Sequence, residues 1–332
     1  MQVDFLSVLI TVLSLVVLAV PGYILAKLKL LPEKASDACS TIVLYVCQTA
    51  LVFMGFQKQP YNPSIGKNML IVFGLATAMH IIMIAVMYVC FRNKSKQAKQ
   101  NVVRYAGVFS NCGYMGMPFL QALFPNSGEI LIYCAVVIAV FNIFNWTIGV
   151  YMMSGNKKDI SAKKVLLNPV IISVILGFVV FMVAKVPIVD LATDGSTLDS
   201  ILEKFIGSIN FLGNMVTPLA MIVIGIRLAN VNLKQLFVDK WAYVVCFFKL
   251  IVMSLVTMLV VSFLPIDSMV KLAMFFLLSM PCATSTALYA IKFNGEGDVA
   301  SVFVLLSTIL SILTIPLMFL IMSGVFGITA PI

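Results

Sequence analysis

Two short segments place a proline beside small and polar residues inside stretches that are otherwise strongly apolar. The first contains Asn111, Cys112, Gly113, Tyr114, Gly116 and Pro118, and the second contains Pro281, Cys282, Ala283, Thr284, Ser285 and Thr286. A proline removes a backbone hydrogen bond and disrupts a continuous helix. The half-helix that follows such a break presents free N–H groups and a partial positive charge, which together bind anions. The two segments therefore predict a site for the anionic group of a ligand.

Acidic side chains are missing from the centres of the apolar stretches. All thirteen aspartates and glutamates fall in expected loops or at the ends of expected spans. A proton relay or cation site built from carboxylates at the middle of a membrane is therefore not expected. Without carboxylates, the electrostatic potential at the middle of the membrane is expected to be positive, which favours an anionic ligand.

Two basic side chains, His80 and Lys249, also lie inside apolar stretches. Histidine changes its charge near physiological pH, so His80 is a candidate for carrying a coupling proton. The alternative is a neutral, hydrogen-bonded histidine. Lys249 lies roughly 13 Å from the nearer end of its stretch, and we expect it to support the pair of broken helices or to compensate charge. The alternative is a lysine whose ammonium group extends to the lipid headgroups.

Asn142 and Asn145 lie on one face of a predicted helix and are further candidates for substrate binding. Their alternative role is hydrogen bonding between helices within the membrane. Gln48 and Asn214 interrupt two other apolar stretches and are candidates for the opposite wall of the same cavity.

The elements that hold these residues are membrane-spanning helices. Hydrophobic residues make up 61% of the 332-residue chain and charged residues 11%, a composition typical of membrane proteins and not of soluble ones. A span needs about 20 mostly apolar residues, so the chain has room for about ten spans and no sizeable soluble domain. The predicted spans are 5–26, 37–56, 68–91, 104–124, 129–152, 165–185, 204–226, 241–264, 269–291 and 299–322.

The basic residues predict how these spans are oriented. Most lysines and arginines fall in alternate connectors, beginning with the first, and the positive-inside rule makes those connectors cytoplasmic. Both termini are then outside the cell membrane. Because the formal charge of +9 is spread over loops and not gathered in a basic domain, nucleic acid is not an expected partner.

The ten predicted spans form two sets of five, in residues 1–155 and 160–325. An odd number of spans per set inverts the second set relative to the first, as in many secondary transporters. The two proline-containing segments fall in the fourth span of each set, spans four and nine. The expected fold is therefore an all-α polytopic membrane protein with a 5+5 inverted repeat, in which broken helices four and nine cross.

Three motifs carry a resemblance to a known family: the segment 111–118, the segment 218–225 followed by Leu228, and the segment 281–286. Together they resemble the auxin efflux carrier family, which includes plant PIN-type carriers and bacterial malate permease-like proteins, over essentially the whole chain. The resemblance implies a scaffold of spans 1, 2, 6 and 7, and a transport domain of spans 3–5 and 8–10 that moves like an elevator. It also implies that Asn111, Gly113–Pro118 and Pro281–Thr286 bind a substrate carboxylate, and that the protein forms a homodimer through the scaffold.

The sequence thus predicts a secondary transporter of a small organic anion such as a mono- or dicarboxylate or an auxin-like acid. The connector between the two sets is short, unlike the long loop of many plant carriers, which favours a bacterial carboxylate permease. The alternatives are a sodium-coupled symporter of the bile-acid type and a membrane sensor that transports nothing. An enzyme is not expected, and neither is a cofactor, a metal site or a disulfide framework, because one histidine and seven scattered cysteines form no such motif.

Overall fold

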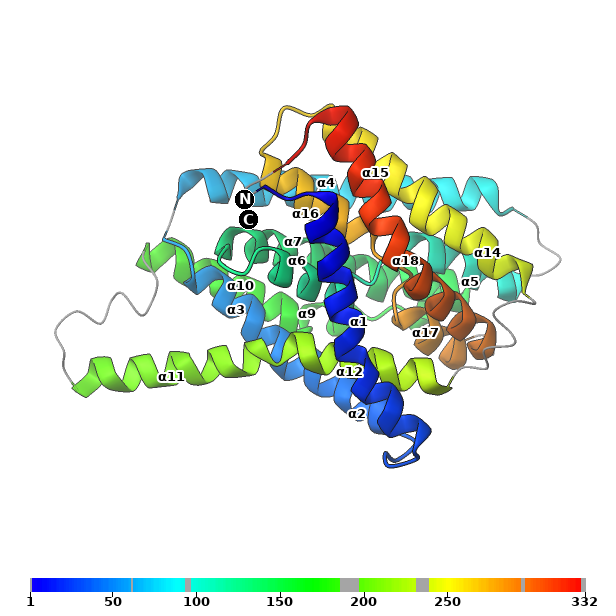
Figure 1. Cartoon of the computed structure of the whole chain (residues 1–332), viewed down its shortest axis with the longest axis horizontal. Helices are drawn as coiled ribbons and strands as arrows, with labels where there is room; N and C mark the ends of the chain where they lie inside the picture. The colour runs from blue at the N-terminus through cyan, green and yellow to red at the C-terminus, as the bar shows by residue number, and fades with distance from the viewer. Residues whose placement is uncertain are drawn as a thin grey trace.

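A computed structural model describes residues 2–60, 62–92, 97–185, 197–230, 239–293 and 296–329. These residues are mostly helical and include one isolated antiparallel bridge but no strand (Figure 1). Parts of three connectors, at 93–96, 186–196 and 231–238, lie outside the described residues, and with them some of the lysines used to predict orientation.

Eight helical stretches in the described part of the chain are long and apolar enough to cross a membrane. They are α1 (Phe5–Lys27), α2 (Ala35–Ile42) with α3 (Gln48–Gln57), α4 (Pro63–Cys90), α7 (Gly128–Phe144) with α8 (Val150–Ser154), α9 (Ala162–Leu166) with α10 (Pro169–Ala184), α11 (Thr197–Asn214) with α12 (Val216–Asn230), α14 (Lys240–Cys246) with α15 (Met253–Ser262), and α18 (Gly297–Phe326). They coincide with eight of the ten predicted spans to within several residues. The prediction of a polytopic α-helical membrane protein is confirmed.

The stretches predicted as spans four and nine each contain two shorter helices. In the first, α5 (Gln97–Val108) is followed by a non-helical segment, a π-helical turn at Cys112–Gly116, and α6 (Met117–Leu123). In the second, α16 (Ser268–Ser279) and α17 (Ser285–Phe293) are separated by residues 280–284. Met280 is extended, with φ −58° and ψ 153°, because a following proline disfavours the helical conformation.

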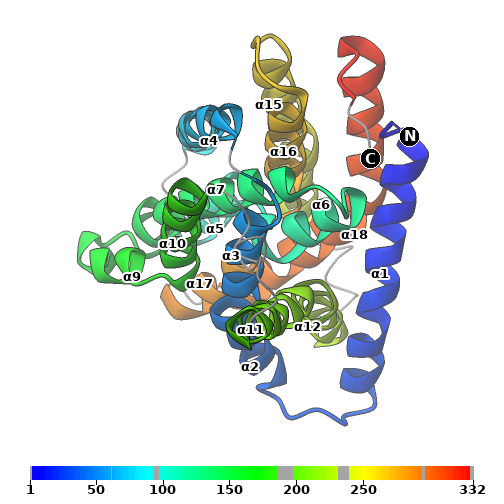
Figure 2. The same ribbon diagram turned by 90° about the vertical axis from the view of Figure 1, so that its left-hand side faces the viewer.

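Two groups of helices pack against one another. In one group, α1 packs on α12, and α3 packs on α10 and α11; in the other, α4 packs on α7, α16 on α7 and α15, and α18 on α14 and α17. Contacts of α3 with α7 and of α1 with α18 join the groups. Seen from the side, α1 lies at one edge of the molecule and α9 at the opposite edge (Figure 2).

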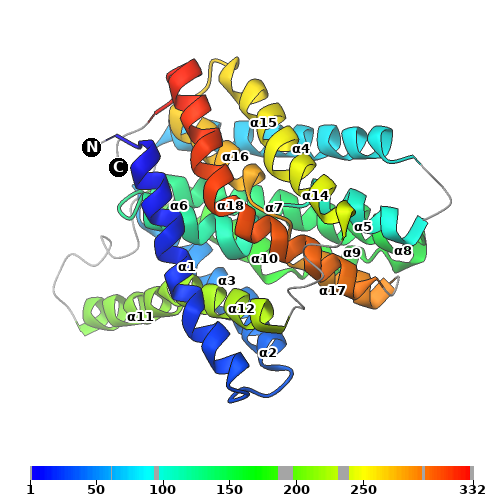
Figure 3. The same cartoon turned by 45° about the vertical axis from the view of Figure 1, so that its right-hand side comes forward.

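The paired helices α1 and α12 cross in close contact (Figures 1 and 3). Two glycines permit this approach. A Cβ atom at Gly225 would lie 1.9 Å from the Ala19 carbonyl oxygen, and one at Gly22 would lie 2.2 Å from that of Ile222. Small residues at such contacts allow helix backbones to approach within a membrane.

We expect Gly225→Ala to destabilise the protein by about 1–3 kcal/mol, because the added methyl group must push the two backbones apart. Thermal unfolding of the detergent-purified protein measures the effect. Gly74→Ala is the matched control, since no atom lies within 4 Å of a Cβ built at Gly74. Equal melting temperatures for the two variants would contradict the close packing of α1 and α12.

Candidate functional site

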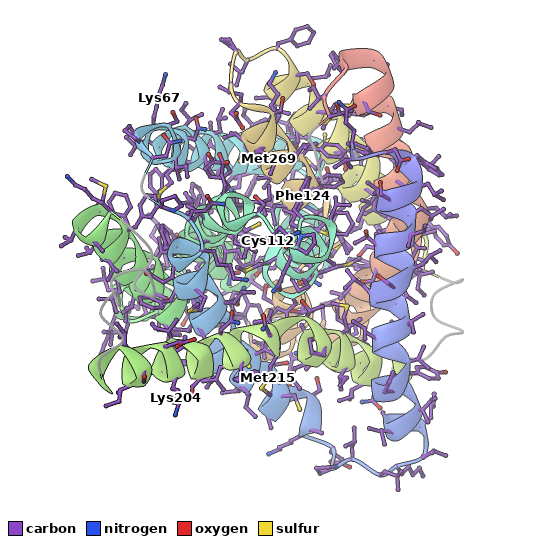
Figure 4. All side chains as sticks on the ribbon, turned by 60° about the vertical axis from the view of Figure 1, so that its left-hand side comes forward. Lys67, Cys112, Phe124, Lys204, Met215 and Met269 are labelled. Carbon is purple, nitrogen blue, oxygen red and sulfur yellow. The ribbon has the colours of Figure 1, made fainter. Side chains whose placement is uncertain are left out.

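The two helix interruptions meet and hydrogen-bond to each other near the centre of the described structure. Asn111 donates its backbone N–H to the carbonyl oxygen of Pro281 (2.8 Å), and Ala283 donates to that of Phe109 (2.9 Å). Ser110 and Cys282 form the antiparallel bridge at this point. Cys112, next to the bridge, lies amid the surrounding helices (Figure 4). Segments about 170 residues apart, each predicted from a proline beside small and polar residues, thus form one structure.

Four helix ends converge on the point where the two interruptions meet, which we call the crossing. Helices α5 and α16 end here, so that their last carbonyl groups carry partial negative charge, while α6 and α17 begin beyond it. Two N–H groups of the π-helical turn, from Met115 and Gly116, donate to the carbonyl oxygen of Asn111 (3.1 and 3.0 Å). Pro118 lies in the first turn of α6, which continues directly from this π-helical turn.

Lys249 lies behind the crossing and is completely buried. Its Nζ donates to Ser110 Oγ (2.6 Å) and to the carbonyl oxygens of Leu278 (3.2 Å) and Val108 (3.4 Å). These carbonyl groups belong to the last turns of α16 and α5, so the ammonium group lies where two helix C-termini concentrate negative charge. The side chain does not extend toward lipid headgroups, and the backbone around it forms a π-helical turn, Phe247–Val252.

His80 is also buried, and its ring lies near that of Phe109 at the crossing, with 6.1 Å between ring centroids. Its Nδ1 is 2.7 Å from the carbonyl oxygen of Ala76, one turn earlier in α4. The ring stacks on Phe144, with 5.0 Å between ring centroids. His80 lines neither of the two cavities described next, and its surroundings match the alternative of a hydrogen-bonded histidine within the core.

Two cavities of about 550 and 410 Å³ adjoin the crossing. Both are lined by Asp37, Asn111, Arg227, Thr284 and Leu288. The smaller one is lined by eight of the residues predicted from the sequence to bind substrate: Asn111, Gly113, Tyr114, Asn142, Asn145, Ala283, Thr284 and Ser285. The other predicted residues line neither cavity: Cys112, Gly116, Pro118, Pro281, Cys282 and Thr286.

Asn111 is the most informative of these residues. Its side chain is 3% exposed, and its Nδ2 has no hydrogen-bond partner among the described residues, although the residue lines both cavities. A buried N–H group without a partner is costly, by about 1–3 kcal/mol. A donor of this kind at the edge of a cavity is suited to a ligand oxygen.

The two predicted asparagines of α7 and its extension are instead bonded within the protein. Asn142 donates to the carbonyl oxygen of Ile138 (3.0 Å). The side chain of Asn145 accepts from the Tyr105 hydroxyl and donates to the Tyr289 hydroxyl (3.2 Å). The Tyr105 hydroxyl lies 2.8 Å from Ser285 Oγ, so this network joins α5, α7 and α17 beneath the cavity.

Arg227 was not predicted as a site residue, because it falls one position beyond the predicted span 204–226. Helix α12 in fact continues to Asn230, which places the half-buried guanidinium group beside both cavities. Arg227 donates through Nε to Ser36 Oγ (2.9 Å) and through Nη2 to Ser40 Oγ (3.1 Å). The helix-favouring residues Leu228 and Ala229 after it were the signal for a longer helix.

Gln48, expected on the opposite wall, lines the smaller cavity and lies 3.4 Å from the carbonyl oxygen of Gly113. Asn214, the other candidate for that wall, ends α11 and lines neither cavity. Within the described residues, no cluster of histidine, cysteine, aspartate and glutamate is suited to a metal ion.

Comparison with known proteins identifies the family of this chain. A family model described as membrane transport protein matches residues 7–165 and 158–319. The chain belongs to this family of membrane transport proteins. It is the auxin efflux carrier family that the three sequence motifs resemble, and the resemblance is thereby confirmed.

Two curated relatives are similar over almost their whole lengths. The chain is 22% identical over 310 residues to the uncharacterized transporter MJ1031 of Methanocaldococcus jannaschii, covering 92% of this chain and 96% of that one. It is 24% identical over 319 residues to a putative malonate transporter of Rhizobium meliloti, covering 91% and 92% respectively. Membership of the family and these relatives identify the protein as a membrane transporter.

Proposed function

We propose that this protein is a secondary transporter of a small organic anion, and that the crossing of the two broken helices binds a carboxylate of that anion. The observation that carries this proposal is the buried Nδ2 of Asn111, which has no partner in the described residues and borders both cavities. A substrate carboxylate accepts hydrogen bonds readily and supplies the missing acceptor. The name of one relative, a putative malonate transporter, supports a small carboxylate.

In this proposal the interrupted stretches 97–123 and 268–293 are spans four and nine of a ten-span, 5+5 inverted repeat. An even number of spans places both termini on one side of the membrane. The hydrogen bond between Thr329 Oγ1 and Gln2 Oε1 (3.4 Å) supports this arrangement. The positive-inside rule makes this side the outside.

We assign α1, α2–α3, α10 and α11–α12 to a scaffold, through which a homodimer forms, and the remaining helices to a transport domain. The cavities then lie between the two, with Arg227 and Gln48 on the scaffold and Asn111 and Thr284 on the transport domain. Alternating access follows when the transport domain slides along the scaffold and carries the crossing with it.

In this proposal Lys249 does not bind substrate but stabilises the crossing. Its ammonium group supplies fixed positive charge at the C-terminal ends of α5 and α16. A bound sodium ion is not needed to neutralise these carbonyl groups. We therefore expect substrate binding without sodium, in contrast to a sodium-coupled symporter. His80 has no part in binding, because it lines neither cavity.

A cross-link between scaffold and transport domain tests the sliding movement. Thr217 on α12 donates to Gln121 Oε1 on α6 (3.2 Å), and neither residue lines a cavity. In a variant without the seven natural cysteines, we expect Gln121→Cys with Thr217→Cys to lose uptake when a short reagent is added that joins the two thiols through disulfide bonds. Reduction should restore uptake, and each single substitution should be unaffected by the reagent. Full uptake in the cross-linked protein would contradict the sliding movement.

Ligand-induced thermal stabilisation tests the proposed function itself. A ligand that binds the folded protein raises its apparent stability by mass action, by about 2.7 kcal/mol at a hundred times its Kd. We expect malonate or another small carboxylate to raise the melting temperature of the purified protein equally in sodium and potassium buffers. Stabilisation by sodium or by neutral compounds alone would overturn the proposal.

A further inference from the structure

Arg227 carries a positive charge at the wall of both cavities, near the exposed carboxylate of Asp37 but not in an ion pair with it. Its hydrogen-bond partners are the hydroxyl groups of Ser36 and Ser40, on α2. Among the described residues, the guanidinium group forms no ion pair. Since arginine has five N–H donors in a planar fork, donors remain for a ligand after these two hydrogen bonds.

Arg227 and Asn111 belong to different helix groups and border the same two cavities. Arg227 lies near the end of α12, which packs on α1, whereas Asn111 lies at the crossing formed by the α5–α6 and α16–α17 segments. Thr284 of the crossing and Asp37 of α2 also border both cavities. A ligand in the shared region therefore meets a charged donor from one wall and a neutral amide donor from the other.

Three acidic residues, Glu33, Asp37 and Asp298, line the larger cavity. Asp37 and Asp298 fall in the first turns of α2 and α18, and Glu33 lies just before α2. All three are solvent-exposed or at helix N-termini, where water, salt and the partial positive charge of the helix offset them. Of the three, only Asp37 also lines the smaller cavity. The region shared by the two cavities thus contains one arginine and one exposed aspartate.

We propose that Arg227 binds a second carboxylate of the substrate while Asn111 binds the first, so that the substrate class is a short dicarboxylate. This inference rests on the proposed function, because it assumes that the crossing binds a carboxylate. Guanidinium and carboxylate groups form paired, charge-assisted hydrogen bonds that fix orientation as well as add energy. A monocarboxylate leaves the guanidinium group without an anionic partner and binds more weakly.

The test compares malonate with its monomethyl ester, which has nearly the same shape and one carboxylate fewer. Binding to purified wild-type protein and to Arg227→Gln is measured by isothermal titration calorimetry. We expect Arg227→Gln to weaken malonate binding about 10- to 100-fold, the loss of one charge-assisted contact. Monomethyl malonate should bind the two proteins within about threefold of each other. An equal loss for both ligands, or no loss for malonate, would overturn the inference.

Two further variants separate binding from folding. The exposed Arg92 provides a matched control, and Arg92→Gln should leave the affinity for both ligands unchanged. Ser36→Ala with Ser40→Ala removes the hydroxyl partners of Arg227 but keeps its charge, so we expect this variant to retain the preference for malonate. Its loss of that preference would show that Arg227 acts only by holding α2.

If wild-type protein binds neither ligand but remains folded, the proposed function itself fails; if it binds both equally, only the dicarboxylate inference fails.

Discussion

Asn111→Ala is expected to reduce the affinity for a small carboxylate about 10- to 100-fold, because one hydrogen bond to a charged group contributes about 1.5–3 kcal/mol. Without ligand, the same variant should be no less thermostable than the wild-type protein. The Nδ2 of Asn111 makes no hydrogen bond within the described residues, so the substitution removes a buried donor and breaks no hydrogen bond of that donor. Thermal unfolding with and without malonate measures both effects on one sample.

Asn68→Ala is the matched control, for which we expect the opposite result: lower stability and unchanged affinity. The Asn68 amide donates to the Tyr133 hydroxyl (2.9 Å), and Asn68 lines neither cavity. Without ligand, this variant should have a lower melting temperature, because its free energy of unfolding falls by about 1 kcal/mol. Its affinity for malonate should be unchanged. A stable Asn111→Ala variant with unchanged affinity would contradict the proposal that the crossing binds the carboxylate.

Lys249→Met is expected to destabilise the protein by about 3 kcal/mol or more and to abolish uptake. The methionine side chain has a similar length but no donors, so Ser110 Oγ and the carbonyl oxygen of Val108 lose the contacts that they receive from Nζ. The carbonyl oxygen of Leu278 keeps only the hydrogen bond from the Ser110 hydroxyl. Each buried acceptor left without a partner costs about 1–3 kcal/mol. The same change also leaves two helix C-termini facing each other without a positive charge between them.

Lys204→Met is the control for Lys249→Met, because Lys204 is exposed on α11 and points away from the other helices (Figure 4). Its effect on stability should stay within about 0.5 kcal/mol, as for most surface substitutions. Thermal unfolding and uptake into liposomes are measured for both variants. Wild-type stability and uptake in Lys249→Met would mean that the crossing does not depend on the ammonium group.

The sequence predicted the helices and the two interruptions because both depend on local composition. Continuous apolar runs define the eight long spans, and a proline beside small and polar residues marks each of the two interruptions. The position of the first break was less well predicted. The chain leaves the helix before Asn111, which has φ −76° and ψ 49°, whereas Pro118 lies inside the first turn of the next helix. The helical conformation resumes at Cys112 in the π-helical turn, so Pro118 marks neither the end of the first helix nor the start of the next.

Contacts between distant segments were beyond what local patterns predict. The hydrogen bonds from Asn111 to Pro281 and from Ala283 to Phe109 depend on how the two halves pack. Lys249 was expected to support the crossing, but its partners emerge only from that packing. Arg227 was missed because a charged residue just beyond an apolar run is normally assigned to a loop. Its burial follows from the extra turn of α12 and from the hydroxyl groups of α2.

Flux of labelled malonate across liposomes that contain the purified protein tests the central claim most directly. We predict saturable uptake above that of protein-free liposomes, independent of sodium, stimulated by unlabelled malonate trapped inside, and strongly reduced by Asn111→Ala. Malonate that binds the protein in detergent but never crosses the liposome membrane would contradict transport and would indicate a sensor.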